Sequence, residues 1–417
     1  MTLNLCGVDF GTSNSTVALP SGVVLPIDPV AAEPRLFRSV LFYPEGTREV
    51  FAGTRAVDEY LVRSEGRFLQ SLKGWLASTS FHSTNIRNRA ITLEDLCGTL
   101  LRRIKEQAEA AAGQSLERAV IGRPALFSDD PEADALAERR LRAAATTAGW
   151  KEIELCIEPI AAALAYEADL KRDELVLVGD FGAGTSDFTL MRLGPSGRGK
   201  RDRRPDILAS GGVAIGGDRV DAAIMRHKLL PHFGGGSTYD AFGKRMPMPL
   251  ALLGKLLAWH ELSFLRDRTT EEMLDRILHG SDAPRAIEAL QDLVSENLGY
   301  RLFRAIEAAK VALSKDARTV IHFDEARIQL DEPITRVELE TYVAPLLERF
   351  AATVSDVIAR AGVADAQLDA IFLTGGTSQI PSVRGLFVQR FGPDRIRSAD
   401  AFTSVAEGLG RSAGATG

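Results

Sequence analysis

Two glycine turns carry residue types that suit phosphate and magnesium. One reads Asp9-Phe-Gly-Thr-Ser-Asn14, and the other reads Asp180-Phe-Gly-Ala-Gly-Thr-Ser-Asp187. A glycine turn can point backbone N–H groups at an anion with no Cβ in the way, and the hydroxyl groups after the glycines add further donors. Mg²⁺ prefers hard oxygen ligands, which each aspartate supplies. Because the sequence contains this arrangement twice, we predict a site for phosphate and Mg²⁺.

A third glycine turn, Gly375-Gly-Thr377, follows an apolar strand at 368–374. None of the three turns has the spacing of the commoner nucleotide motifs. The sequence contains no Gly-x4-Gly-Lys-[Ser/Thr] loop, and Gly182-Ala-Gly184 lacks the third glycine and the helix of a dinucleotide fingerprint. A single turn of this kind is more often a structural hairpin, so the prediction depends on the pairing.

Apolar strands are needed to hold these turns in place. One strand ends at Phe10 and a second spans 174–180, and each is followed by a return strand, at 16–19 and 188–193. Two copies of this unit, about 170 residues apart, predict two similar lobes. Further patterns predict a strand at 119–122, helices at 93–112, 131–148, 158–166, 336–361 and 403–413, a mainly helical stretch at 222–310 and a strand region near 319–334.

Composition and charge exclude several classes of protein. The 417 residues are 45% hydrophobic and 25% charged, which is ordinary for a globular chain. A net charge of −6 gives no field for nucleic acid or a membrane, and no apolar stretch reaches the roughly 18 residues of a spanning helix. The basic run 198–204 is expected to be a solvated hairpin loop. Three widely spaced cysteines, and a start without a basic region, predict a cytoplasmic protein.

The two turns resemble the phosphate loops of the DnaK (heat-shock-70) chaperone family, and the resemblance extends over almost the whole chain. Four further segments resemble its connecting helix, its Gly-Gly-x-x-x-Asp segment and its two adenosine-binding segments, in the family's order: 158–166, 216–221, 307–314 and 373–381. The short YegD-like proteins are the branch that the chain resembles most. The resemblance implies the α/β fold of actin-like ATPases, in which each of two lobes has a ribonuclease-H-like mixed sheet flanked by helices.

The resemblance also implies domain limits. Lobe I would span 1–169 with a small inserted subdomain near 37–92, and lobe II would span 170–417 with a helical insertion near 216–343. Because the sequence ends soon after the last core helix, we expect no C-terminal peptide-binding domain. The helical segment 222–306 is then the expected surface for client or co-chaperone proteins.

Roles for the turn residues follow from the same resemblance. The β- and γ-phosphates of ATP or ADP would be held by the hydroxyls and backbone of Gly11, Thr12, Ser13, Asn14, Gly182, Ala183, Gly184 and Thr185. Asp9 and Asp180 would hold Mg²⁺, mostly through water, because magnesium keeps its hydration shell. Both aspartates end apolar strands, where an unpaired charge is costly, which favours a functional role.

Four residues are candidates for catalysis. Lys73, in the segment 68–75, matches the family's catalytic lysine and would stabilise negative charge on the γ-phosphoryl group. Glu158 and Asp187 would position the attacking water or accept its proton, next to Thr185. The alternative interpretations are a solvated surface lysine, a carboxylate that only starts a helix, and a hydrogen-bond acceptor within a hairpin.

Further candidates would bind the rest of the nucleotide. These are Glu307, Lys310 and Ser314 at the ribose and the adenine edge, and Gly216, Gly217, Gly375, Gly376 and Gln379 around them. Val311 and Gln379 stand where the family commonly has two arginines that sandwich the adenine ring. Neither side chain can make a cation–π contact with a base. We therefore expect weaker or less selective adenine binding than in the chaperones.

The sequence thus predicts a slow, Mg²⁺-dependent ATPase that acts as a nucleotide-gated switch in protein folding or partner binding. The helices at 158–166 and 403–413 are the expected hinge, and the expected state is a monomer. Three alternatives stay open: a nucleotide-sensing module with negligible turnover, a small-molecule kinase of the same superfold, and an actin-like filament protein. The kinase is disfavoured because 68–75 and 158–166 match chaperones, and nothing in the sequence supplies a filament contact.

Overall fold

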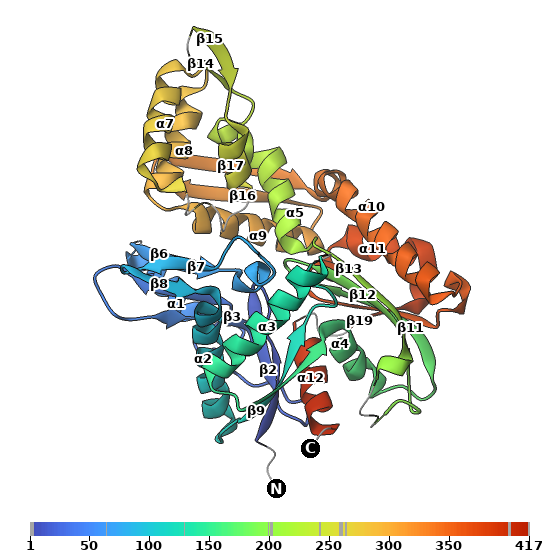
Figure 1. Ribbon diagram of the computed structural model, residues 1–417. Helices are drawn as coiled ribbons and strands as arrows, with labels where there is room; N and C mark the ends of the chain where they lie inside the picture. The colour runs from blue at the N-terminus through green and yellow to red at the C-terminus, as the bar shows by residue number, and fades with distance from the viewer. Residues whose placement is uncertain are drawn as a thin grey trace. The chain divides into compact units, whose positions relative to one another are not determined.

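The computed structural model describes residues 4–415 except 64, 129, 199, 201–202, 242, 258–261, 263–264 and 399–401. The chain forms two compact units (Figure 1). Unit 1 comprises residues 1–216 and 348–417, and unit 2 comprises residues 217–347. The finer division into two lobes with inserted subdomains stays a prediction.

The first five-stranded sheet of unit 1 holds the first glycine turn. Its strands lie in the order β10-β9-β1-β2-β3. Strands β1 and β2 form an antiparallel hairpin in which Asp9 lies opposite Thr16, while β9 is parallel to both β1 and β10. The bounds are β1 Leu5–Asp9, β2 Asn14–Ala18, β3 Phe37–Arg38, β9 Arg118–Arg123 and β10 Glu152–Ile157. The predicted hairpin and the predicted strand at 119–122 are confirmed.

The second five-stranded sheet repeats this pattern around the second turn. Its order is β13-β12-β11-β18-β19. Strands β11 and β12 form an antiparallel hairpin in which Asp180 lies opposite Asp187, while β18 is parallel to both β11 and β19. The bounds are β11 Glu174–Phe181, β12 Ser186–Leu193, β13 Ile207–Val213, β18 Ala370–Thr374 and β19 Ile396–Ser398. Two mixed sheets of one topology, flanked by helices, confirm the predicted fold class.

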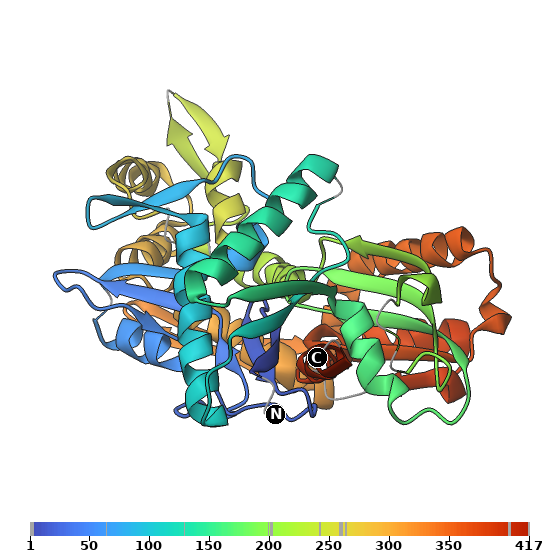
Figure 2. The ribbon, with the colours of Figure 1, turned by 60° about the horizontal axis from the view of Figure 1, so that its bottom comes forward.

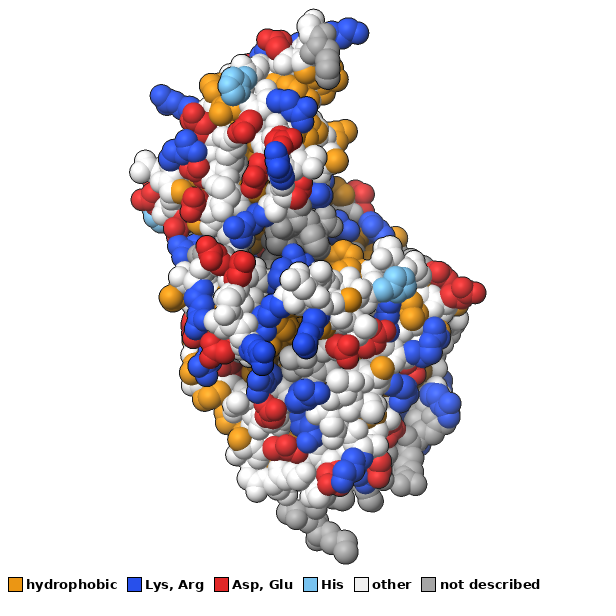
Figure 3. Space-filling view, turned by 60° about the vertical axis from the view of Figure 1, so that its left-hand side comes forward, with side chains coloured by type: hydrophobic (Ala, Val, Ile, Leu, Met, Phe, Trp, Pro, Cys, Tyr) orange, Lys and Arg blue, Asp and Glu red, His pale blue; other side chains and the backbone are white. Residues whose placement is uncertain are grey.

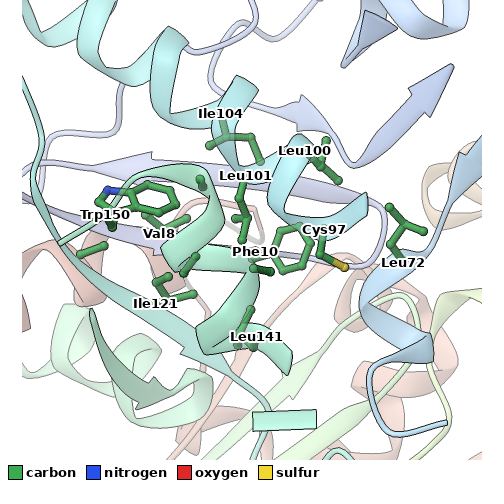
Figure 4. Close-up of a cluster of buried hydrophobic side chains, with 14 of the residues drawn as sticks. Val8, Phe10, Leu72, Cys97, Leu100, Leu101, Ile104, Ile121, Leu141 and Trp150 are labelled. Atoms are coloured by element: carbon green, nitrogen blue, oxygen red, sulfur yellow. The ribbon is translucent and has the colours of Figure 1, made fainter. Parts of the chain in front are cut away.

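Helices α2 (Leu93–Ala112) and α3 (Pro131–Ala148) cover one side of the first sheet (Figure 4). Both helices were predicted over these ranges. The hydroxyl of Thr92 caps α2 by accepting a hydrogen bond from the backbone N–H of Asp95. Val8 of β1 and Phe10, which directly follows this strand, pack into this core with the buried leucines of α2, whereas Leu5 belongs to a second core. This alternation is the period of a strand that is buried on both sides.

Two helices rich in small residues pack against each other beside both sheets. Helix α4 spans Glu158–Glu167, α12 spans Ser404–Ala415, and both views of the ribbon show them side by side (Figures 1 and 2). A Cβ on Gly408 of α12 would lie 1.7 Å from the carbonyl oxygen of Ala161, so only glycine fits there. The predicted close approach to the helix at 403–413 is confirmed. The core around α4 and α12 includes Val120 of the first sheet and Phe372 of the second.

The other side of the second sheet carries an aromatic cluster. Phe181 and Phe188 contact Phe350 of α10 (Arg336–Ala361) and Phe387 of α11 (Pro381–Phe391). The ring plane of Phe181 is nearly perpendicular to those of the other three residues. Such edge-to-face pairs add to the gain from burial. The remaining elements of unit 1 are β4 Val40–Pro44, β5 Phe51–Ala52, α1 Thr54–Arg63, β6 Gly66–Gln70, β7 Ser83–Ile86 and β8 Arg89–Thr92.

Unit 2 consists of helices and two β-hairpins. Its helices are α5 Gly217–Ile224, α6 Leu250–Leu256, α7 Arg268–Gly280, α8 Pro284–Ser295 and α9 Gly299–Lys315, followed by the hairpin β16 Arg318–Glu325 and β17 Ile328–Thr335. The helical stretch and the strand region were predicted, but the hairpin of β14 Thr238–Ala241 and β15 Lys244–Pro247 was not. Gly243, which has φ +70°, lies in its turn and is the signal that the sequence offered.

The expectation of a solvated loop at 198–204 is wrong for Arg203, whereas Arg198 is exposed as expected. The guanidinium of Arg203, which is 9% exposed, donates to both carboxylate oxygens of Glu167 at 2.6 and 2.8 Å. Arg198 donates to the carbonyl oxygen of Glu167 at 2.8 Å. Because the buried carboxylate of Glu167 needs a cation, the segment packs onto the end of α4. Residues 199, 201 and 202 lie outside the described residues.

The surface shows no large field of one sign on the face drawn in Figure 3, where acidic and basic side chains are interspersed. This distribution agrees with the modest net charge of −6. Within the part of the chain that the structure describes, no helix has both the length and the apolar composition needed to cross a bilayer.

Candidate functional site

The glycine turns of the two sheets come together within unit 1. A Cβ on Gly184, between β11 and β12, would lie 3.5 Å from Oγ1 of Thr12, between β1 and β2. Both turns are tight. The N–H of Gly182 donates to the carbonyl of Thr185 at 3.0 Å, and a Cβ on Gly11 would lie 2.0 Å from the carbonyl oxygen of Asn14. The donors of both turns are therefore close enough to serve one anionic ligand.

Two further predicted glycines pack against the second turn. A Cβ on Gly216 would lie 2.3 Å from the carbonyl oxygen of Ala183, and a Cβ on Gly375 would lie 2.3 Å from that of Phe181. Gly375 also has φ +83°, which favours glycine. The hydroxyl of Thr377 donates to the carbonyl oxygen of Gly182 at 3.0 Å. The third turn is thus fastened to the second.

The remaining predicted residues of unit 1 lie on the same turns. The carbonyl of Ser13 accepts a hydrogen bond from the N–H of Ser39 at 3.0 Å, directly before Asn14 begins β2. Gly376 begins the short helix η7 (Gly376–Gln379), and its far end, Gln379, is exposed. The structure therefore brings the first, second and third turns into one region.

A buried ion pair joins Lys73 to Glu158. Lys73 lies in the short helix η1 (Leu72–Trp75), and its ammonium group donates to Oε1 of Glu158, the first residue of α4. The two side chains are 8% and 10% exposed. Burial lowers the pKa of Lys73, but the negative charges of Glu158, Asp9 and Asp180 outweigh burial and raise it overall. Lys73 is therefore a buried cation, and the interpretation as a solvated surface lysine is wrong.

Aspartates surround this ion pair with negative charge. Loss of hydration raises the pKa of Asp9 from 3.8 to about 7, with a further rise from the charge of Glu158 and an opposing effect of Lys73. Burial and the charges of Glu158, Asp187 and Asp9 hold the pKa of Asp180 well above its ordinary value. With Asp187, four carboxyl groups share the one ammonium group of Lys73, which leaves excess negative charge in a poorly hydrated place.

Asp187 is 2% exposed and is held by two donors. The backbone N–H of Ala125 donates to its Oδ1 at 3.0 Å, and the hydroxyl of Thr185 donates to its Oδ2 at 3.1 Å. Burial and the charge of Glu158 raise the pKa of Asp187 to about 7, although both hydrogen bonds and Lys73 oppose the rise. A carboxyl group with such a pKa can gain or lose a proton near neutral pH.

Three residues of this site were not predicted. A Cβ on Gly122 of β9 would lie 3.0 Å from Cγ of Glu158, and a Cβ on Gly212 of β13 would lie 2.6 Å from Oδ1 of Asp187, so each glycine makes room for a carboxylate. Glycine inside a strand pattern is the available signal for such a close approach. The backbone of Ala125 offers no signal, because any residue except proline supplies an N–H group.

The cluster fits a divalent cation. The pKa values of Asp9 and Asp180 are raised by burial and by neighbouring negative charge, and Mg²⁺ would supply the missing positive charge. Among the described residues, no three His, Cys, Asp or Glu side chains converge closely enough to hold a metal ion themselves. Mg²⁺ usually keeps several of its waters in proteins, so carboxyl groups such as those of Asp9 and Asp180 can hold it through water. That they hold Mg²⁺ stays a prediction.

The predicted adenosine residues of unit 2 lie on two of its helices. The ammonium group of Lys310 is 2.8 Å from Oδ1 of Asp221. Burial lowers the pKa of Lys310, but the negative charges nearby, above all that of Asp221, outweigh burial and raise it overall. This ion pair ties α9 to α5, so Lys310 has a structural role in unit 2. The other predicted residues of unit 2 are Gly217 at the start of α5 and Glu307, Val311 and Ser314 on α9.

Comparisons with known proteins agree with this fold. The family profile described as "Hsp70 protein" matches residues 72–249 and 285–415. The chain is 26% identical over 437 aligned residues to the chaperone protein DnaK of Thermus thermophilus, covering 98% of this chain and 60% of that protein. It is 26% identical over 410 residues to the chaperone protein DnaK of Halobacterium salinarum, covering 97% and 54%. The chain thus spans 54–60% of the length of these relatives.

Proposed function

Because this chain belongs to the Hsp70 family, we propose that it binds ATP with Mg²⁺ and hydrolyses ATP slowly. One observation carries the proposal: the glycine turns, the Lys73–Glu158 ion pair and three aspartates meet within unit 1. Together they offer donors for an anion, an excess of carboxylate for Mg²⁺ and a group that can take a proton. A structural hairpin needs none of these.

The turns would bind the phosphates. The backbone of both turns and the hydroxyls of Thr12, Ser13 and Thr185 supply donors on a rigid frame, because each turn is closed by tight backbone packing. Asp9 and Asp180 would hold Mg²⁺, mostly through water. When bound, Mg²⁺ neutralises phosphate charge and lowers the pKa values of nearby carboxyl groups.

The buried side chains would act on the reacting atoms. The charge of Lys73 would stabilise the transferred phosphoryl group, and Glu158 holds that ammonium group in place. Asp187, fixed by Ala125 and Thr185, would orient the attacking water and accept its proton. Burial and the charge of Glu158 raise the pKa of Asp187, which makes this carboxylate a better proton acceptor.

The nucleotide would set the conformation of the protein through α4 and α12. Glu158 begins α4, Gly408 of α12 packs on Ala161, and the core around them includes residues of both sheets. A change at Glu158 can therefore reach both sheets through packed side chains. Client or co-chaperone proteins are the proposed partners, at 222–306, a range that includes residues outside the described ones. The monomeric state and the cytoplasmic location stay predictions.

Single-turnover hydrolysis of γ-labelled ATP with Mg²⁺ tests the proposal. The wild type should hydrolyse ATP, and Lys73→Met should bind ATP but hydrolyse it about 100-fold more slowly, because the methionine keeps the volume and removes the charge. Lys151→Met is the matched control. Lys151 is a lysine of unit 1 that is 68% exposed and pairs with Glu117 on the surface, so its loss should leave the rate unchanged.

Other outcomes separate the alternatives. Binding without hydrolysis by the wild type would identify a nucleotide-sensing module, and transfer of the label to an added metabolite would identify a kinase. If the wild type binds no nucleotide, the proposed site is wrong. Because Lys73→Met leaves Glu158 buried without its cation, circular dichroism and thermal unfolding of the variant must first show an intact fold.

A further inference from the structure

Phe402 lies beside the third glycine turn. The nearest carbon of its ring is 3.2 Å from the position that a Cβ on Gly376 would occupy, so the ring rests against backbone that has no side chain. Phe402 is 49% exposed, whereas the other phenylalanines among the described residues are buried or half-buried. Exposure of one apolar residue needs no explanation by itself, but exposure at this place does.

The chain directly after Phe402 is anchored. Thr403 and Ser404 are 5% and 2% exposed. The hydroxyls of Ser404 and Thr374 are 2.6 Å apart, and Thr374 directly precedes Gly375. The carbonyl of Thr403 accepts a hydrogen bond from the N–H of Glu407 in the first turn of α12. The residues that carry the ring and the turn that it touches are therefore fixed to each other.

We propose that the ring of Phe402 is the platform on which the base of the bound nucleotide stacks. The inference rests on the proposed function, because it requires the phosphates in the glycine turns. The hydrogen bond from Thr377 to Gly182 holds the third turn against the second. The third turn is therefore within reach of the nucleoside of a nucleotide whose phosphates lie in the second turn. There Gly376 has no side chain, and the aromatic ring of Phe402 lies beside it.

An aromatic platform offsets the two missing guanidinium groups. Val311 and Gln379 cannot give a cation–π contact, whereas a phenyl ring stacks on any base through its π-face. Stacking of this kind does not read the hydrogen-bonding edge of a base. The site should therefore take purine nucleotides with little preference, and ATP and GTP should bind within about fivefold of each other.

Equilibrium binding of ATP, GTP and Mg²⁺-tripolyphosphate to three proteins tests the inference. Phe402→Ala should weaken ATP and GTP binding about 10-fold or more and leave tripolyphosphate unchanged, because only the nucleotides have a base to stack. Phe402→Trp should restore nucleotide affinity. Its indole fluorescence should be quenched by ATP and not by tripolyphosphate, after subtraction of the same titrations of the wild type, which has 3 tryptophans of its own.

The controls separate this inference from the proposed function. Val62→Ala shortens an 83% exposed apolar side chain on α1 and should change none of the affinities. Equal ATP affinity of the wild type and Phe402→Ala would overturn the inference and leave the proposed phosphate site intact. Binding of tripolyphosphate but not of ATP by the wild type would do the same. If the wild type binds neither ligand, both proposals fail. Should Phe402→Ala not fold, the quenching of Phe402→Trp decides.

Discussion

The two glycine hairpins of unit 1 share one topology, and one of the positions at which they differ lies directly opposite the aspartate. Asp9 is the last residue of β1, Asp180 is the last but one of β11, and each lies just before the glycine turn of its hairpin. The residue opposite Asp9 is Thr16, and the residue opposite Asp180 is Asp187. The same place in the repeat therefore holds a neutral hydroxyl in one sheet and a buried carboxyl group in the other.

Because of this difference, we assign different roles to the two hairpins. Like charges directly opposite each other on neighbouring strands are destabilising, and the charge of Asp187 raises the pKa of Asp180. The second sheet bears that cost and supports Asp187 with two donors, whereas the hydroxyl of Thr16 finds no hydrogen-bond partner among the described residues. We infer that the first hairpin binds and that the second hairpin binds and also transfers the proton.

Asp187→Asn and Thr16→Val should show the largest difference in hydrolysis rate between the two hairpins. Asp187→Asn keeps an oxygen for the N–H of Ala125 and lets Thr185 accept instead of donate, so ATP should still bind. Hydrolysis should fall about 100-fold or more, because the asparagine cannot take a proton. Thr16→Val removes an unpartnered hydroxyl at nearly constant shape and should leave the rate within about twofold. Single-turnover kinetics at saturating ATP compares them, and equal effects at the two positions would refute the division of work.

Substitution of the two glycines that make room for carboxylates, Gly212 and Gly122, should give a smaller difference in hydrolysis rate. An added Cβ in Gly212→Ala would lie 2.6 Å from Oδ1 of Asp187, so the carboxylate must shift from the N–H of Ala125. We expect a loss of about 10-fold in the hydrolysis rate, since small displacements of a reacting group are costly. In Gly122→Ala the contact is 3.0 Å to Cγ of Glu158, and a loss of about threefold is expected. The same kinetic assay measures both, and the reverse order would contradict the role given to Asp187.

Much of this site was readable from the sequence, and the reasons for the exceptions are physical. Strand–turn repetition located Asp9 and Asp180, and apolar spacing located the helix at 93–112, because both patterns are local. The packing of Gly212 against Asp187 depends on how β13 pairs with β12, which no local pattern states. The burial of Arg203 was missed for the same reason, since its partner Glu167 lies on α4. That the assigned residues bind nucleotide and catalyse its hydrolysis stays a prediction.

The smallest expected effect is on the pH dependence of the stability of the protein without nucleotide or Mg²⁺. The folded protein holds the pKa of Asp9 and of Asp187 at about 7, whereas both have ordinary values of 3.8. Between these values the folded state binds more protons than the unfolded state, so the free energy of unfolding falls as pH rises. This contribution is complete below pH 3.8 and is lost by about pH 7.

Thermal unfolding at pH 5.5 and pH 8.0 checks this dependence. The drop in melting temperature between the two values should be about 2–5 °C smaller for Asp187→Asn than for the wild type. Thr16→Val should follow the wild type, because its change removes no titrating group. The comparison between variants cancels the contributions of all other titrating groups, and an unchanged drop in Asp187→Asn would contradict the assigned pKa.

The central claim is that both glycine turns hold the phosphates of one nucleotide. A crystal structure of the protein with Mg²⁺ and a non-hydrolysable ATP analogue tests it most directly. The account predicts phosphate oxygens within hydrogen-bonding distance of the turn at Thr12 and of the turn at Thr185, with Mg²⁺ reached from Asp9 and Asp180 largely through water. Phosphates that touch only one turn, or that bind elsewhere in the molecule, would contradict it.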